Sequence, residues 1–225
     1  MHQPIIELQQ VSKTFPAAAG LFHALSQVTL SFGQGQLIAV TGKSGSGKST
    51  LLNIIAGIDK PSSGTVSVNG LRIDKLSESA LASWRGKNIG VVFQFFQLLP
   101  TLTIAENVML PMDFCHTWPR NERRQRALAL LERVDIKEQA DKFPSALSGG
   151  QQQRAAIARA LANDPPVIVA DEPTGNLDSQ TAAAIFQLFT NLAKAGKTVI
   201  VVTHEKEFAA SFEKTITIID GAIKN

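Results

Sequence analysis

The chain carries the stretch Gly42-Lys43-Ser44-Gly45-Ser46-Gly47-Lys48-Ser49 between an apolar run, Leu37–Thr41, and a helix-like run, Thr50–Gly57. This stretch matches the pattern GxxxxGK[ST], which forms a phosphate-binding loop when a strand precedes it and a helix follows it. Its backbone can curl so that successive N–H groups point at one anion, and the helix adds its positive N-terminal end. The stretch therefore predicts a nucleotide-binding α/β protein.

Two side chains of this loop are predicted to act directly on the phosphates. Lys48 is expected to reach the β- and γ-phosphates as a point charge, and the hydroxyl of Ser49 is expected to ligate Mg²⁺. Lys43 either adds charge near the phosphates or is a solvated loop lysine, and the second account is favoured. The predicted nucleotide-binding residues of this stretch are Gly42, Lys43, Ser44, Gly45, Ser46, Gly47, Lys48, Ser49 and Thr50.

Two further apolar runs, Val167–Ala170 and Val199–Thr203, also end in polar residues and precede helical patterns. With Leu37–Thr41 they indicate a mainly parallel sheet with crossover helices, in which ligands bind at the carboxyl ends of the strands. Other segments alternate apolar and polar residues and indicate a flanking antiparallel β layer with a tight turn. These segments are Ile5–Val11, Gln27–Phe32, and Thr65–Val68 followed by Asn69-Gly70.

The residues between about Leu76 and Ala162 are mostly helical in pattern, with the clearest helices at Arg123–Val134 and Gln152–Ala162. The strand that carries Asp171 returns to the α/β core only after this region. We therefore expect a single phosphate-loop α/β domain over residues 1–225. In it, residues 1–94 and 161–225 form the core and its β layer, and residues 95–160 form an inserted helical subdomain.

Two adjacent carboxylates, Asp171 and Glu172, end the apolar run Val167–Ala170. A buried strand does not carry such charges without a use. Asp171 is predicted to hold Mg²⁺ through water, and Glu172 to act as the general base on the attacking water. His204 follows the run Thr198–Thr203 and is predicted to touch the γ-phosphate or that water, with a structural hydrogen bond as the alternative.

A second glycine-rich stretch, Leu147-Ser148-Gly149-Gly150-Gln151, precedes the predicted helix Gln152–Ala162 and can also bind an anion. Because Gln152-Gln153-Arg154 follows it, this stretch resembles the signature of the ABC transporter ATPases. The phosphate loop, the signature and Asp171-Glu172 come in the order of that family and cover nearly the whole chain. The resemblance implies that Ser148, Gly149, Gly150 and Gln151 bind the ATP of an opposite subunit.

The resemblance implies three more site residues. Gln94, after the strand Ile89–Phe93, matches the glutamine that contacts Mg²⁺ and links the site to the helical subdomain. Asp178, in a Gly-Asn-Leu-Asp sequence, matches the loop that crosses the dimer interface. Phe15 stands where the family usually has a tyrosine stacked on adenine. It departs from the pattern but keeps the stacking face, and a core or surface phenylalanine is the alternative.

Within the family, Asp171–Asp178 and Asn88–Met112 are most similar to the lipoprotein-release, macrolide-export and cell-division group. The resemblance implies an ATPase that uses ATP and Mg²⁺, forms a homodimer on binding ATP and works with an integral membrane subunit. Dimer closure would drive export, lipoprotein release or force transmission. Because the sequence ends at Asp220–Asn225 without an added regulatory domain, we expect a separately encoded subunit.

Two other functions compete with this one. A soluble ATPase of the same family acting on ribosomes or DNA repair intermediates would carry two ATPase units or a long coiled coil, and neither pattern is present. A non-hydrolysing, ATP-gated scaffold is disfavoured by Glu172 and His204. The sequence identifies neither the cargo nor the membrane subunit.

Composition indicates a folded chain, with 44% hydrophobic and 18% charged residues and a net charge of +3. So small a charge predicts no nucleic-acid partner. The basic cluster Arg120, Arg123, Arg124 and Arg126 is interpreted as a solvated helical face. The lone Cys115 cannot form an internal disulfide and receives no role.

The longest apolar runs are strand-sized, far below the roughly 20 residues that cross a bilayer. The segment Met1 to Glu7 lacks the features of a secretory signal. We therefore expect a cytoplasmic chain that lies on the inner face of the cell membrane through its partner.

Overall fold

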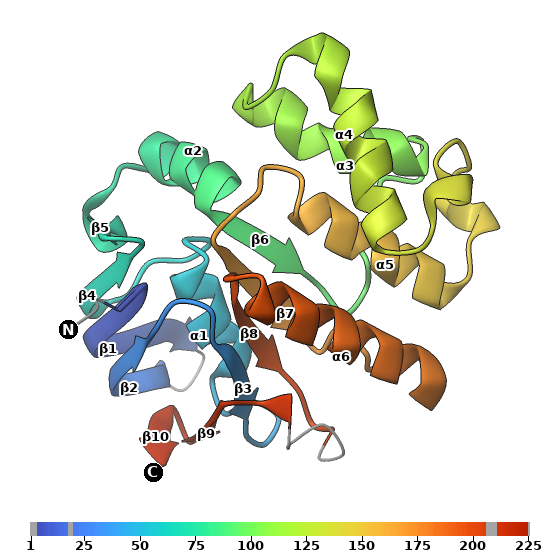
Figure 1. Cartoon of the computed structure of the whole chain (residues 1–225). Coiled ribbons are helices and arrows are strands. Elements are labelled where there is room, and N and C mark those ends of the chain that lie inside the picture. Colours follow the sequence, from blue (N-terminus) through green and yellow to red (C-terminus); the bar gives the residue numbers. More distant parts are fainter. Residues whose placement is uncertain (1–3, 18–19, 206–210, 225) are drawn as a thin grey trace.

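The computed structural model describes residues 4–17, 20–205 and 211–224, and part of the predicted N-terminal segment, residues 1–3, lies outside them. Within the described residues, the main sheet has the strand order β10-β9-β3-β8-β7-β6 (Figure 1). Strands β9, β3, β8, β7 and β6 are parallel, and β10 is antiparallel to β9. The strands are β3 (Leu37–Thr41), β6 (Ile89–Val92), β7 (Val167–Asp171), β8 (Thr198–Val202), β9 (Lys214–Ile219) and β10 (Ala222–Lys224).

A second, antiparallel sheet has the strand order β2-β1-β4-β5. Its strands are β1 (Ile6–Ala17), β2 (Gly20–Phe32), β4 (Ser63–Val68) and β5 (Leu71–Arg72). Both β1 and β2 are longer than predicted. The tight turn at Asn69-Gly70 is confirmed, with φ of 50° and 75° at its two residues, the left-handed pair that closes a two-residue hairpin.

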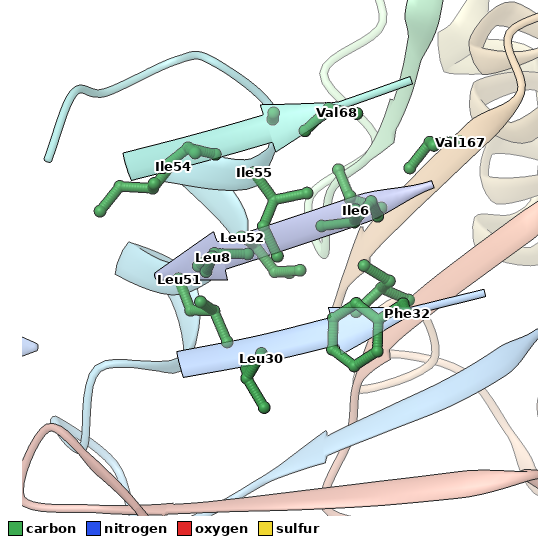
Figure 2. Close-up of a cluster of buried hydrophobic side chains, with 14 of the residues drawn as sticks. Ile6, Leu8, Leu30, Phe32, Leu51, Leu52, Ile54, Ile55, Val68 and Val167 are labelled. Carbon is green, nitrogen blue, oxygen red and sulfur yellow. The ribbon is translucent and has the colours of Figure 1, made fainter. Parts of the chain in front are cut away.

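Helix α1 (Lys48–Ile55) lies between the two sheets, where Leu51, Leu52 and Ile55 pack in one buried cluster with Ile6 and Val167 (Figure 2). The helix begins at Lys48 and ends at Ile55, two residues before each of the predicted bounds. Each fully buried leucine or isoleucine contributes about 1.5–3 kcal/mol. The phosphate loop that leads into α1 therefore stands on a rigid base.

The strands of the main sheet alternate their side chains between two cores, as the pleat requires. Val167 and Ile200 join the core around α1, whereas Ile168 and Val199 join a core on the opposite face. That second core also takes residues from four helices. These are α3 (Ile104–Cys115), α4 (Arg120–Arg133), α5 (Gly149–Ala160) and α6 (Ser179–Lys194).

Figure 1 shows α3 and α4 as a group that stands apart from the sheets and meets them along α5. Buried side chains run without a break from this group into the main sheet. The subdomain bounds 95–160 remain a prediction. The other helical elements are η1 (Ile73–Lys75), α2 (Glu78–Asn88), η2 (Lys137–Gln139) and η3 (Pro144–Ala146).

The arginines at the start of α4 do not all form a solvated face, and that interpretation is wrong for one of them. Arg123 is only 7% exposed, donates to the carbonyl of Trp118 at 2.8 Å and pairs with Asp113. The guanidinium of Arg126 lies 3.3 Å from the centre of the Trp118 ring. The pairing with Asp113 holds the Arg123 side chain against α3.

Among the helices of the described residues, none has the length and apolar character needed to cross a bilayer.

Candidate nucleotide-binding site

The phosphate loop is closed by its own lysine. Gly47 is the N-cap of α1, with φ of 107° and no side-chain cap, so the first N–H groups of the helix are left open toward the loop. The ammonium of Lys48 donates to the carbonyls of Gly42 and Lys43, both at 2.9 Å, and the residue is 6% exposed. The loop therefore surrounds a buried positive charge beside an uncapped helix start, as an anion site requires.

Neighbouring strands lie against this loop on two sides, and their closeness requires glycine at two positions. A Cβ at Gly47 would lie 2.3 Å from the carbonyl oxygen of Ala24 on β2. A Cβ at Gly42 would lie 2.3 Å from the carbonyl oxygen of Ile218 on β9. Both glycines also have positive φ, a backbone conformation costly for other residues.

Asp171 lies at the carboxyl end of β7, beside the first turn of α1. Burial raises the pKa of Asp171, and the charge of Glu172 adds to this, while a hydrogen bond from the Ser49 hydroxyl and the charge of Lys48 oppose the rise. The structure thus brings the predicted metal residues Ser49 and Asp171 into contact.

This donor set fits Mg²⁺, which takes oxygen ligands and is usually held by one or two carboxylates together with substrate phosphates and water. In the described part of the chain, no group of three or more His, Cys, Asp or Glu side chains is arranged to hold a metal by itself. Ser49 and Asp171 could supply two oxygen ligands, and the phosphates of a nucleotide together with water could supply the others.

The two predicted catalytic residues lie against each other. The imidazole Nε2 of His204 is 3.0 Å from Oε1 of Glu172. Glu172 has φ of 46°, in the left-handed region that a non-glycine residue rarely adopts, and its N–H donates to the carbonyl of Val202 at 3.0 Å. This turn directs the Glu172 side chain toward the end of β8, where His204 begins the next loop.

Gln94 lies just beyond β6 and approaches the loop that follows Glu172. A Cβ built on Gly175 would be 3.1 Å from Nε2 of Gln94. Farther along the same segment, the ring of Phe96 would be 3.7 Å from a Cβ on Gly149. The segment after β6 therefore touches both the carboxylate loop and the signature.

The signature forms the first turn of α5, whereas the sequence pattern placed it before the helix. Ser148 is the N-cap, its hydroxyl accepts from the N–H of Gln151 at 3.3 Å, and Oε1 of Gln151 accepts from the N–H of Ser148 at 3.0 Å. A Cβ on Gly150 would lie 2.5 Å from Thr181, so the starts of α5 and α6 are in close contact. The polar capping residues hid this boundary from the apolar pattern.

Asp178 is the N-cap of α6. Its carboxylate accepts from the N–H of Thr181 at 2.9 Å and from the hydroxyl of Thr181 at 2.6 Å. These hydrogen bonds lower the pKa of Asp178. Within one chain the residue therefore has a complete structural role, and the interface role remains a prediction.

Phe15 lies on β1 opposite Phe22 of β2, and the two residues are 37% and 50% exposed. The ammonium of Lys13 is 4.8 Å from the centre of the Phe15 ring. Its ring is accessible to a planar ligand, as the predicted stacking on adenine requires.

A cavity of about 770 Å³ opens beside the phosphate loop. It is lined by Gly42–Ser46, His204 and residues of β9, but Lys48, Asp171 and Glu172 do not line it.

Gln153, which has no predicted role, is completely buried between the ends of β6 and β7. The available signal was its position two residues after the signature. An apolar helix pattern does not distinguish a buried glutamine from a solvated one.

These features define a nucleotide-binding protein of the phosphate-loop class. The sheet is mainly parallel, the phosphate loop joins the end of β3 to an uncapped helix, and two carboxylates lie nearby. The glycine-rich start of α5 narrows this class. The family model described as ABC transporter matches residues 25–175, and the chain belongs to this family as an ABC ATP-binding cassette with an ATPase domain.

Named relatives agree with this assignment. The chain is 46% identical over 224 residues to the ABC transporter ATP-binding protein MJ0796 of Methanocaldococcus jannaschii, covering 98% of this chain and 95% of that protein. It is 44% identical over 223 residues to the macrolide export ATP-binding/permease protein MacB of Burkholderia pseudomallei (strain 1710b). That match covers 99% of this chain and 34% of MacB, so the chain spans about a third of that relative. The resemblance to the group that includes macrolide exporters is confirmed.

One solved structure is the dimeric post-hydrolysis state of the MJ0796 cassette bound to ADP and Pi. It matches with a TM-score of 0.91 and 44% identity, covering 98% of this chain and 97% of that chain. The predicted α/β fold is confirmed by this similarity.

Proposed function

We propose that the chain hydrolyses ATP in a Mg²⁺-dependent homodimer and drives a separate integral membrane subunit. The contact of His204 with Glu172 carries this proposal, because a general base needs a partner that orients it, and the imidazole of His204 lies 3.0 Å from the Glu172 carboxylate. The solved relative that holds ADP and Pi supports the same reaction.

In this proposal the loop N–H groups and Lys48 hold the β- and γ-phosphates, and Phe15 stacks on the adenine. Ser49, Asp171 and Gln94 would hold Mg²⁺, Asp171 through water, and the bound ion would supply positive charge beside the phosphates. Glu172 accepts a proton from the attacking water. His204 holds the Glu172 carboxylate in place and contacts the γ-phosphate.

In a single chain the γ-phosphate would lack the contacts that the signature of another copy supplies. The first turn of α5, with Ser148, Gly149 and Gly150, offers a second anion-binding start for an ATP held by another copy. Asp178 would lie at the same interface. ATP bridges two chains only while the γ-phosphate is attached, so hydrolysis removes the bias toward the closed dimer. The dimeric relative supports this arrangement.

The segment after β6 is proposed as the contact with the membrane subunit, at the cytoplasmic face of the membrane. Phe95 and Leu99 are 67% and 46% exposed. Leu98 instead packs against the second core, and Phe96 lies beside Gly149. Exposed apolar side chains on a loop favour a partner, and burial of one phenyl ring would contribute about 2 kcal/mol.

Phosphate release from ATP tests the enzymatic part of the proposal. Purified chain is assayed with Mg-ATP and with ATP in excess EDTA. We expect turnover in the first case and a loss of most of it in the second, since the phosphates and Asp171 then lack their shared cation. Equal turnover in both would contradict the Mg²⁺ assignment.

The membrane part is tested with Phe95→Glu. Co-purification with the candidate membrane subunit should be lost, because a charge replaces the exposed ring, while ATP affinity of the isolated chain stays unchanged. Leu71→Glu, at an exposed apolar residue of β5, is the matched control and should still assemble. Assembly of Phe95→Glu at the native level would rule out this contact.

A further inference from the structure

Gln153 is a long polar side chain in an apolar position. It lies in the second turn of α5, is fully buried, and is followed by the buried residues Ala155, Ala156 and Ile157. Burial of an amide reduces stability unless its polar atoms find hydrogen-bond partners. The partners that Gln153 has therefore indicate why a polar residue is kept there.

The amide nitrogen of Gln153 bridges the ends of two strands. Nε2 donates to the carbonyl of Pro173 at 2.6 Å and reaches the carbonyl of Phe93 at 3.5 Å, the outer limit of a hydrogen bond. Carbonyl oxygens only accept, so the NH₂ group must face them. Phe93 directly precedes Gln94, and Pro173 directly follows Glu172.

The bridge supports a backbone that is strained at the predicted catalytic base. Glu172 has a φ of 46°, and such a conformation persists only where the surroundings hold it. On one side its N–H donates to Val202, and on the other side Gln153 holds the carbonyl of Pro173. The position of the Glu172 carboxylate thus depends on both contacts.

The other end of the Gln153 amide has no such role. Within the part of the chain that the structure describes, Oε1 is buried and has no hydrogen-bond partner. A residue chosen only to fill this core would avoid that cost, which a methionine of similar length does not carry. The amide therefore acts through its NH₂ group, which donates to the two carbonyls.

We propose that Gln153 is a positioning residue that fixes Glu172 and Gln94 relative to the signature helix, so that the base faces the γ-phosphate. The inference rests on the proposed ATPase function. It adds a link inside one chain from α5 to the hydrolytic carboxylate. A movement of α5 would reach Glu172 through this side chain.

The test compares Gln153→Met with the wild-type chain. Methionine keeps the length and burial but removes the donor, so kcat should fall roughly tenfold or more, since small misplacements of a catalytic group have such effects. The KM for Mg-ATP and the affinity for a fluorescent ATP analogue should stay within about twofold. Gln187→Met, on the exposed face of α6, is the matched control and should keep the native kcat.

Gln153→Glu supplies a readout that core packing alone would not move. A protonated carboxyl can donate to Pro173 and an ionised one cannot, and burial raises the pKa of a carboxyl. We expect kcat of Gln153→Glu to approach the wild-type value at low pH and to fall below it as the pH rises. Gln153→Met should follow the wild-type pH profile at a reduced level.

Three outcomes would overturn the inference. Native kcat in Gln153→Met would show that the bridge is not needed. A parallel loss of kcat, ATP affinity and Tm, with no pH-dependent recovery in Gln153→Glu, would reduce the residue to core packing. If the wild-type chain itself fails to hydrolyse Mg-ATP, the proposed function fails and the inference fails with it.

Discussion

The phosphate loop and the start of α5 are both glycine-rich helix starts, yet the chain completes them differently. Helix α1 has Gly47 as its N-cap and no side-chain cap, and a buried lysine and two carboxylates lie near this end. Helix α5 begins at Ser148 with a full capping box made by Gln151. One start is left open beside reactive groups, and the other is stable by itself.

This difference assigns separate tasks to two otherwise similar motifs. The open start of α1 leaves N–H groups that a phosphate can fill, so binding a nucleotide completes it. The start of α5 needs no ligand to be stable, because Ser148 and Gln151 already cap it. We infer that hydrolysis takes place at the α1 half of the site, which consists of the phosphate loop, Asp171 and Glu172. A second chain would act through the α5 half, which consists of the signature Leu147–Gln151.

The largest effect is expected at the α1 half from Glu172→Gln. The amide keeps the shape of the side chain but loses the base, so turnover should fall roughly 10²- to 10⁴-fold while ATP still binds. The variant should then accumulate as an ATP-dependent dimer. Phosphate release and size-exclusion chromatography with and without ATP measure both results. Native turnover would place the base elsewhere.

Lys48→Ala should have the next largest effect, on binding instead of turnover. The loop amides remain, but the charge that reaches the terminal phosphates is lost, so affinity for Mg-ATP should fall roughly a hundredfold, or about 2–3 kcal/mol. Titration with a fluorescent ATP analogue checks this. The neighbouring Lys43→Ala serves as a comparison and should weaken binding much less, because its ammonium is interpreted as solvated. Unchanged affinity in Lys48→Ala would remove this residue from the site.

Ser148→Arg tests the α5 half without touching the α1 half. One chain should bind ATP as before, but the bulky charge should block ATP-dependent dimerisation. Loss of the cap alone costs about 1 kcal/mol, so the chain should still fold. Ser148→Thr keeps the cap and should dimerise.

Mixing Ser148→Arg with Lys48→Ala chains sharpens the comparison. Each mixed dimer retains one composite site in which the phosphate loop of one chain faces the intact signature of the other. Partial ATP-dependent association should therefore return. If mixing restores none, the two halves do not meet across a head-to-tail dimer.

The α1 half could be read from sequence because its signals are local. The spacing from Gly42 to Ser49 and the pair Asp171-Glu172 each follow an apolar strand, so pattern alone placed them at strand ends. The structure adds what spacing cannot provide, namely the contact between Glu172 and His204 and the loop-closing hydrogen bonds of Lys48.

The α5 half was harder to predict because its features depend on distant neighbours. The helix boundary was placed at Gln152 because Ser148 and Gln151 cap the helix with polar groups, which an apolar pattern reads as loop. The burial of Gln153 and of Arg123 depends on which strands and helices pack around them. Neither residue differs in type from exposed glutamines and arginines of the same chain.

The smallest expected effect separates stability from function in the α1 half. Asp171 has a raised pKa because of its burial, so the folded chain without ligand holds an unfavourable charge. Asp171→Asn should therefore raise the Tm of the nucleotide-free chain by about 2 °C at neutral pH. This increase in Tm is fully present above the raised pKa of Asp171. It disappears at acid pH, where the aspartate is protonated in both the folded and unfolded states.

With Mg-ATP the wild-type chain should have the higher Tm, because its Asp171 carboxylate then gains a contact with the ion and the variant does not. Thermal unfolding with and without Mg-ATP, at neutral and acid pH, measures all four cases. Asp135→Asn, at an exposed aspartate outside the site, is the control and should leave the Tm nearly unchanged in each case. A lower Tm for Asp171→Asn without nucleotide would mean that the hydrogen bond from Ser49 outweighs the burial of the charge, and that the α1 half is stable before it binds ATP.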